Sequence, residues 1–365
     1  MKITQKLRQM LALTLVPNMG PVAFKNGLMA FGSLEGIFGA PASEWRRVEW
    51  LARLNKSVLD EPKIFEEADK EIERALKEKV SIISFFDEAY PSELKEIHDP
   101  PIVLYVKGEL PAKDLLRIAV VGSRYASSHG LKLAEQISHD LANSGVAVVS
   151  GLAKGIDTAA HRGALSAKAP TVAVLGSGLS LIYPPENKKI ASEIASTGAL
   201  ISEYSMTLPP KPGNFPVRNR IISGLSRAVL VAEAREKSGA LITADLALEQ
   251  GRDVYALPGP ADSVKARGSN SLLKQGARFV TSAQDILEDY GIESKGARSA
   301  ASRKKISVTD EEKKLLECLE GLESLHLDDL IVKSEFPAGK AMGLLSVLAL
   351  KGAVRELPGK YFAEK

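Results

Sequence analysis

The chain has 365 residues, of which 45% are hydrophobic and 25% are charged. This composition is typical of folded proteins and excludes wholesale disorder, collagen and coiled coil, while the length predicts two or three domains. Its 48 basic and 45 acidic residues give a net charge of +3, so a nucleic-acid partner would require positive charge that is concentrated locally.

The single cysteine, Cys318, excludes an internal disulfide and a cysteine-based metal cage and is typical of a protein in a reducing compartment. No apolar run reaches the roughly 18 residues that a membrane helix needs, and the first residues lack the apolar core of a signal peptide. We therefore expect a cytoplasmic protein without membrane insertion.

Residues 1–78 are predicted to form a helical domain. Apolar residues recur at helical spacing from Leu7 to Leu15 and again from Leu51 to Ile72. A Gly-Pro turn between two of these helices, at Gly20-Pro21, is typical of a helix-hairpin-helix, which can present backbone N–H groups to a DNA phosphate. The same turn is also an economical way to pack two helices, so both interpretations stay open.

Residues 79–290 are predicted to form an α/β domain. Short apolar runs alternate there with predicted helices; the runs are 118–121, 147–149, 172–175, 200–201, 228–232 and 254–257. Strands that are buried on both faces and separated by crossover helices predict a doubly wound parallel sheet. Two earlier runs, 80–86 and 102–106, are expected to extend that sheet at an edge.

The last part of the chain is predicted to hold a linker and a small domain. Residues 291–306 form the linker, since 294–305 contain five basic residues and no acidic one. A solvated spacer is the favoured interpretation, and an incidental contact with phosphate is the alternative. Residues 307–365 have the outline of a winged helix, with three helices closed by a two-stranded hairpin, and about 60 residues can just support such a core.

In an open parallel sheet, ligands bind beyond the carboxyl ends of the strands. The first loop at that end holds Gly122, Ser123 and Arg124 before a predicted helix, so its N–H groups and the helix dipole can hold an anion. Arg124 stands where a dinucleotide-binding loop needs its second glycine, which argues against NAD or FAD. It offers a bidentate grip on phosphate; an arginine paired with a carboxylate for structural reasons is the alternative.

A later loop, 209–225, combines cations with an aromatic residue. A base can stack on Phe215 while Lys211, Arg218 or Arg220 contacts the backbone of a single strand. A phenylalanine packed into the core of the loop is the alternative.

Two other loops supply small residues before helices, at Ser150-Gly151 and Ser238-Gly239, and each is a possible anion seat. Asp157 and His161 are four residues apart and can share a helix face as acid and base or as metal ligands, but structural hydrogen bonding is the favoured interpretation. The chain lacks a phosphate-binding P-loop, a His-Glu-x-x-His zinc motif and a Gly-x-Ser-x-Gly elbow. We predict no catalytic residue, metal or cofactor.

Taken together, these loops resemble those of the DNA-processing protein A family (DprA, also called Smf). The matching stretches span about 90–280 in the family's order and are 90–94, 99–101, 121–124, 150–157, 215–223, 237–244 and 257–259. The resemblance implies an extended Rossmann-like domain that binds single-stranded DNA. Proteins similar to this one protect incoming strands in natural transformation, help to load the RecA recombinase, act as homodimers and are not known as enzymes.

The resemblance places the family's phosphate-gripping arginine on Arg124 and its aromatic base contact on Phe215. The family's second cation aligns with Pro212 or Gly213, and Lys211 is the nearest lysine. The complete set of predicted DNA-binding residues is Gly122, Ser123, Arg124, Ser150, Gly151, Lys211, Phe215, Arg218, Asn219, Arg220, Ser238 and Gly239.

Two other hypotheses stay open. One is a Rossmann-like hydrolase of nucleoside monophosphates, for which Glu203 and Glu233 are the acids to test. The other is a scaffold that binds only proteins.

Overall fold

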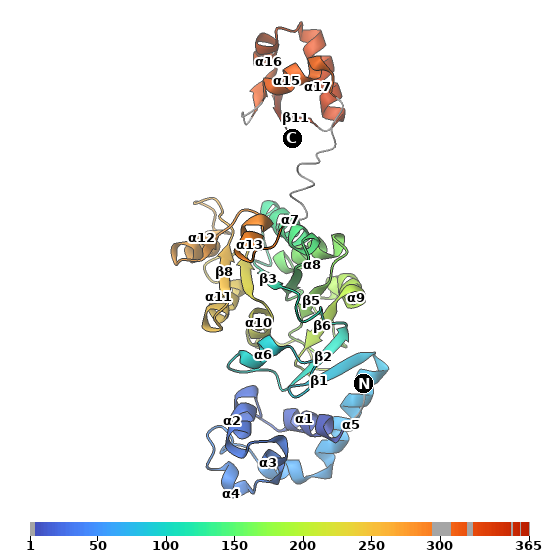
Figure 1. Cartoon of the computed structure of the whole chain (residues 1–365), viewed down its shortest axis with the longest axis vertical. Helices are drawn as coiled ribbons and strands as arrows, with labels where there is room; N and C mark the ends of the chain where they lie inside the picture. The colour runs from blue at the N-terminus through green and yellow to red at the C-terminus, as the bar shows by residue number, and fades with distance from the viewer. Residues whose placement is uncertain (1–3, 294–307, 320–323, 352, 358, 365) are drawn as a thin grey trace. The chain divides into compact units, whose positions relative to one another are not determined.

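The computed structural model describes residues 4–293, 308–319, 324–351, 353–357 and 359–364 (Figure 1). The chain divides into two compact units, Met1–Gly296 and Ala297–Lys365. Most of the predicted linker, 294–306, lies outside the described residues. No helix in the described ranges is long and apolar enough to cross a membrane.

The first unit is built around a nine-stranded sheet, counted over the described residues, with the order β1-β2-β6-β5-β4-β3-β7-β8-β9. From β6 to β9 neighbouring strands are parallel, whereas β1 and β2 add an antiparallel edge. The strands are β1 Val80–Ser84, β2 Val103–Gly108, β3 Arg117–Val121, β4 Ala147–Ser150, β5 Thr171–Val174, β6 Ala199–Ser202, β7 Ala228–Val231, β8 Asp253–Ala256 and β9 Arg278–Phe279.

The predicted parallel sheet and its two-strand extension are therefore confirmed. The strand β9 escaped prediction because it has two residues, both exposed, and so leaves no apolar run. Strand order reverses direction between β3 and β7, which lie side by side. This is the switch point at which an open α/β sheet forms a crevice.

Helices cover both faces of the sheet (Figure 1). Alternate residues of β3 point to opposite faces, as the strand period requires: Ile118 and Val120 pack with α7, α8 and α13, whereas Ala119 and Val121 pack with α10 and α11. The helices of this region are α6 Ser92–Glu96, α7 Ser128–Asn143, α8 Ile156–Ser166, α9 Lys188–Thr197, α10 Asn214–Gly224, α11 Gly239–Glu249, α12 Arg267–Lys274 and α13 Ala283–Asp289, with a short 3-10 turn η2 at Pro185–Asn187.

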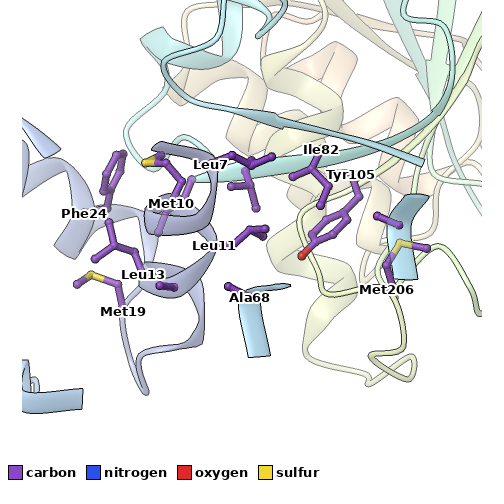
Figure 2. Close-up of a cluster of buried hydrophobic side chains, with 14 of the residues drawn as sticks. Leu7, Met10, Leu11, Leu13, Met19, Phe24, Ala68, Ile82, Tyr105 and Met206 are labelled. Atoms are coloured by element: carbon purple, nitrogen blue, oxygen red, sulfur yellow. The ribbon is translucent and has the colours of Figure 1, made fainter. Parts of the chain in front are cut away.

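The residues before β1 are helical. Leu7 and Leu11 of the first helix share one buried cluster with Ile82 and Tyr105 of the antiparallel edge, and Figure 2 shows these side chains together. The N-terminal helices thus pack on the sheet in one compact unit, and a separate domain boundary at 78/79 stays a prediction. The elements are α1 Gln5–Leu15, α2 Pro21–Phe31, α3 Leu34–Gly39, α4 Ala42–Trp45, η1 Lys56–Asp60 and α5 Pro62–Lys77.

The second unit contains helices and a small sheet of order β10-β12-β11. Leu315, Leu330, Leu345 and Phe362 are among its core residues. The predicted helices and closing hairpin are present, and β10 adds a strand that was too short to be seen as a pattern. Its elements are α15 Asp310–Glu317, β10 Leu325–His326, α16 Leu327–Ser334, α17 Ala338–Leu350, β11 Val354–Leu357 and β12 Tyr361–Glu364.

Candidate nucleic-acid interface

A cavity of about 520 Å³ opens at the carboxyl ends of β3 and β7, beside the switch point of the sheet. Its wall combines the loop after β3, the first turns of α10 and α11, and the tyrosine that precedes η2. Among the described residues that line this cavity, Asp157 carries the one carboxylate. The main lining residues are Gly122, Ser123, Arg124, Tyr125, Asp157, Tyr183, Phe215, Arg218, Asn219, Arg235, Lys237, Ser238 and Gly239.

The loop after β3 is held rigidly by backbone contacts. A Cβ atom on Gly122 would lie 2.6 Å from Cγ1 of Ile156 and 2.8 Å from the carbonyl oxygen of Glu233, so only glycine fits. Ser123 N–H donates to that same Glu233 carbonyl at 2.7 Å, and Ile156 N–H donates to the Ser123 carbonyl at 3.2 Å. The exposed Arg124 side chain therefore projects from a fixed base.

Phe215 lies in the first turn of α10, which begins at Asn214. Pro216 is compatible with this start, because proline at the beginning of a helix removes no helical hydrogen bond. The guanidinium carbon of Arg124 lies 5.4 Å from the centre of the Phe215 ring, and the Tyr183 ring centre lies 5.7 Å from it. Phe215 is half-buried and lines the cavity without joining a described hydrophobic cluster.

Arg218 lies at the inner wall and is almost completely buried. It donates to the carbonyl of Gly151 at 2.8 Å and to that of Val174, and so joins the ends of β4 and β5. Burial lowers the pKa of Arg218 to about 10, with Asp157 opposing that shift. Burial also disfavours the charged form of Asp157 and so raises its pKa to about 6, and the charge of Arg218 opposes this shift.

Arg220 is also buried, and here the predicted DNA contact is corrected. Its guanidinium forms two hydrogen bonds to the Glu203 carboxylate, at 2.5 and 2.6 Å, and an ion pair with Asp99 at 2.8 Å. It does not line the cavity. The reason is helical spacing, because a residue two positions after Arg218 points to a different side of α10.

Other predicted residues also differ in position. The Ser150 hydroxyl is fully buried and donates to the Val120 carbonyl at 2.6 Å, so the predicted DNA contact at Ser150 is corrected. Lys211 is exposed but lies outside the cavity wall, where Pro212 takes part instead. Gly151 donates its N–H to Asp157 at 3.1 Å and lines a smaller adjoining hollow of about 150 Å³.

Ser238 and Gly239 lie at the start of a helix, α11, as the sequence predicts. The Ser238 side chain accepts a hydrogen bond from Ala240 N–H at 3.3 Å and caps the helix. Asn219 donates to the carbonyl of Gly239 at 3.3 Å, which connects α10 to the first turn of α11 at the cavity wall. Arg218, Asn219, Ser238 and Gly239 therefore gather with Arg124 and Phe215 around one opening.

The structural interpretation of Asp157 and His161 agrees with their contacts. Asp157 accepts hydrogen bonds from the N–H groups of Gly151 and Ala153, and the His161 Nδ1 atom lies 2.9 Å from the Thr171 hydroxyl. Within the described ranges, no three acidic, histidine or cysteine side chains gather in a way that could hold a metal ion.

The two acids that the hydrolase hypothesis requires, Glu203 and Glu233, form ion pairs or hydrogen bonds with other residues of the fold. Glu203 pairs with Arg220, and Glu233 accepts hydrogen bonds from the Ser127 N–H at 2.8 Å and from the Ser127 hydroxyl at 2.5 Å. Neither is among the residues that line the cavity.

Four aromatic or cationic residues of the described cavity lining are missing from the predicted set. Tyr125 and Tyr183 are 73% and 44% exposed, which is unusual for large aromatic side chains, and Arg235 and Lys237 supply exposed cations. The available signal was an aromatic residue directly after Arg124 and another directly before two prolines, both in loops at strand ends.

Comparisons with known proteins agree with this architecture. The family model for DNA recombination-mediator protein A matches residues 81–291, which is more than half of the chain. This chain belongs to that family. The model of the DprA winged helix domain matches residues 299–360 of this family member, which agrees with the fold of the second unit.

Individual members of the DNA recombination-mediator protein A family are similar to this chain in sequence. It is 45% identical to DNA processing protein DprA of Streptococcus pneumoniae over 213 residues, which cover 58% of this chain and 75% of the relative. It is 47% identical to protein Smf of Escherichia coli over 203 residues, 55% of this chain and 54% of that protein.

Two solved structures are similar. The Streptococcus pneumoniae DprA structure superposes with a TM-score of 0.69 at 36% identity, covering 80% of this chain and 99% of that one. The structure of DNA processing protein A from Helicobacter pylori gives a TM-score of 0.53 at 30% identity, covering 58% of this chain and 95% of that one.

Proposed function

We propose that this protein binds single-stranded DNA in the cavity at the carboxyl ends of β3 and β7, without catalysing a reaction. One observation carries the proposal: the exposed guanidinium of Arg124 lies over the ring of Phe215, in a wall whose one described carboxylate is the buried Asp157. A phosphate can therefore bind the cation of Arg124 while the adjacent base stacks on the ring of Phe215. The Helicobacter pylori relative is itself described as having a unique single-stranded DNA binding mode.

The charge of the cavity favours a polyanion. Arg124, Arg235 and Lys237 are exposed on the wall, and their positive charge attracts phosphates in a salt-dependent way. Arg218 lies deeper in the wall, where it is almost completely buried and donates hydrogen bonds to the carbonyls of Gly151 and Val174. Stacking on aromatic rings tolerates any base, so the expected ligand is a strand of any sequence.

The proposed role beyond binding is to protect incoming single strands and to help load a recombinase of the RecA type onto them in transformation, with the protein acting as a homodimer in the cytoplasm. Membership of a recombination-mediator family supports this role. A loading assay, in which RecA assembles on strands covered by a single-strand-binding protein with and without this chain, tests it. Equal assembly rates would contradict it, and a monomeric mass in sedimentation would contradict the dimer.

The absence of catalysis is part of the proposal. Glu203 and Glu233 are both engaged in structural hydrogen bonds, so neither is placed to act as an acid or a base on a nucleotide. Incubation with AMP should release no product. Release that scales with protein and disappears in Glu233→Gln would support the hydrolase hypothesis.

The central test compares oligo-dT with a duplex of equal length by fluorescence anisotropy, using the full chain at several salt concentrations. We expect tighter binding to oligo-dT and a linear fall of log affinity with log salt. No binding of oligo-dT at low salt would contradict the proposal and favour a purely protein-binding scaffold.

A further inference from the structure

A second, larger groove lies beside the cavity described above. It occupies about 810 Å³ between α7 and α8. Most of its described lining residues are polar or charged, and none of them is aromatic apart from His139 with its imidazole ring. The residues used below are Ser128, Lys132, Gln136, Lys154, Arg162 and Ser166.

Positive charge dominates the described lining of this groove. Lys132 and Arg162 are exposed, and neither forms an ion pair within the described part of the chain. Lys154 pairs with Glu186 at the margin. Among the described lining residues, Glu135 carries the one carboxylate. Two cations without acidic partners on facing helices therefore face an open groove.

The groove adjoins the candidate DNA site. Lys154 lines both this groove and the hollow that contains Arg124 and Phe215. Next to Lys154, Gly155 at φ +79° packs directly against the loop after β3, where a Cβ atom would overlap the backbone of Ser123 and Arg124. Gly155 therefore brings the start of α8, which lines the groove, against the loop that carries Arg124 of the cavity.

The groove is suited to a sugar–phosphate backbone. Its two helices meet closely at Gly163, where a Cβ atom would lie 2.9 Å from the backbone nitrogen of His139. Hydroxyl and amide groups of Ser128, Gln136 and Ser166 line its walls. Hydrogen-bonding groups and cations without a broad aromatic surface match phosphates better than bases.

We propose that a single strand held in the cavity continues past Lys154 into the α7–α8 groove, where Lys132 and Arg162 contact its phosphates. This inference rests on the proposed function and extends the binding site along the strand. A short strand would fill the cavity alone, whereas a long strand would also occupy the groove.

The test is a comparison of oligonucleotide lengths with the full chain, using oligo-dT of about 5 and about 20 nucleotides, which span the site sizes of single-strand binders. The double variant Lys132→Ala/Arg162→Ala should bind the short strand like wild type. Its affinity for the long strand should fall about tenfold, and its salt slope should shrink by about 1.4, or 0.7 for each lost phosphate contact. Lys132→Arg/Arg162→Lys should retain most of the affinity.

The matched control is Arg227→Ala/Lys274→Ala. It removes the same charge from exposed residues, one directly before β7 and the other at the end of α12 before β9, at the opposite end of the strands. It should bind both lengths like wild type. An equal loss in the control would indicate a general charge effect and overturn the proposal.

The remaining outcomes separate this inference from the proposed function. Failure of wild type to bind oligo-dT of either length contradicts the proposed function itself. Normal binding by wild type, with the groove variant unchanged at both lengths, overturns only the groove. If that variant binds long strands normally but loses RecA loading, the groove holds an acidic protein segment, and the proposal is wrong.

Discussion

The guanidinium of Arg124 lies 5.4 Å from the centre of the Phe215 ring, although the two residues are far apart in the chain. The loop after β3 fixes the first residue and the first turn of α10 fixes the second. A cation and an aromatic ring at this separation form a cation–π contact. The contact presents both groups at one opening, so that one nucleotide can meet the cation with its phosphate and the ring with its base.

Removal of Arg124 should weaken DNA binding in a way that does not depend on sequence. We expect Arg124→Ala to lose about 1.5–3 kcal/mol of binding free energy, the value of a charge-assisted hydrogen bond, equally for oligo-dT, oligo-dC and oligo-dA. The salt slope should fall by about 0.7. Anisotropy titrations at several salt concentrations measure both, with Arg227→Ala as the control. Unchanged affinity in a folded Arg124→Ala protein would contradict this role.

The two exposed tyrosines should contact bases and not phosphates. Tyr125→Ala and Tyr183→Ala are each expected to cost about 1–3 kcal/mol on oligo-dT, while the phenylalanine variants keep the affinity. An abasic strand with the same phosphates should bind each alanine variant as well as wild type. A similar loss on the abasic strand would show that the tyrosines act through the shape of the cavity.

Arg220 should contribute to stability more than to binding. Arg220→Ala leaves the partly buried Glu203 without its partner, and removing one partner of a buried pair costs about 3–5 kcal/mol. Urea unfolding measures the loss, and the double variant Arg220→Met/Glu203→Gln should recover much of it. The folded fraction of Arg220→Ala should bind oligo-dT like wild type. A loss of affinity as large as that of Arg124→Ala would return Arg220 to the DNA interface.

His161 should make stability depend on pH. Thr171 donates its hydroxyl proton to the Val148 carbonyl, so His161 Nδ1 donates to Thr171, and the buried Nε2 has no partner among the described residues. Burial, assisted by the charge of Arg218, lowers the pKa of His161 from 6.5 to about 3. The unfolded chain therefore binds a proton that the folded chain excludes as the pH falls below 6.5.

Above pH 6.5 the titration of His161 takes nothing from the free energy of unfolding. Below pH 6.5 it lowers the free energy of unfolding by about 1.4 kcal/mol for each pH unit, until His161 of the folded chain also takes up a proton. Urea unfolding of wild type and His161→Gln between pH 5 and 8 measures the difference. The stability of wild type relative to the variant should fall as the pH is lowered from 6.5 to 5. Parallel pH profiles would show that His161 does not titrate differently on unfolding.

The sequence by itself determined the parallel sheet and the loop that carries Arg124. Strands buried on both faces must be continuous apolar runs, and the residues that follow them lie at one edge of the sheet by topology alone. The winged-helix outline was visible for a similar reason, because its amphipathic helices and closing hairpin are local patterns.

Only the tertiary structure decided which cations face the opening. Arg218 and Arg220 are two residues apart on one helix, yet Arg218 lines the cavity whereas Arg220 is paired with Glu203 and Asp99 away from it. Asp99 is 121 residues away in the chain, so no local pattern predicts that pair. The exposure of Tyr125 and Tyr183 and the groove between α7 and α8 depend in the same way on long-range packing. Local sequence specifies the strands and helices, whereas the burial and pairing of a charged side chain depend on segments brought together by folding.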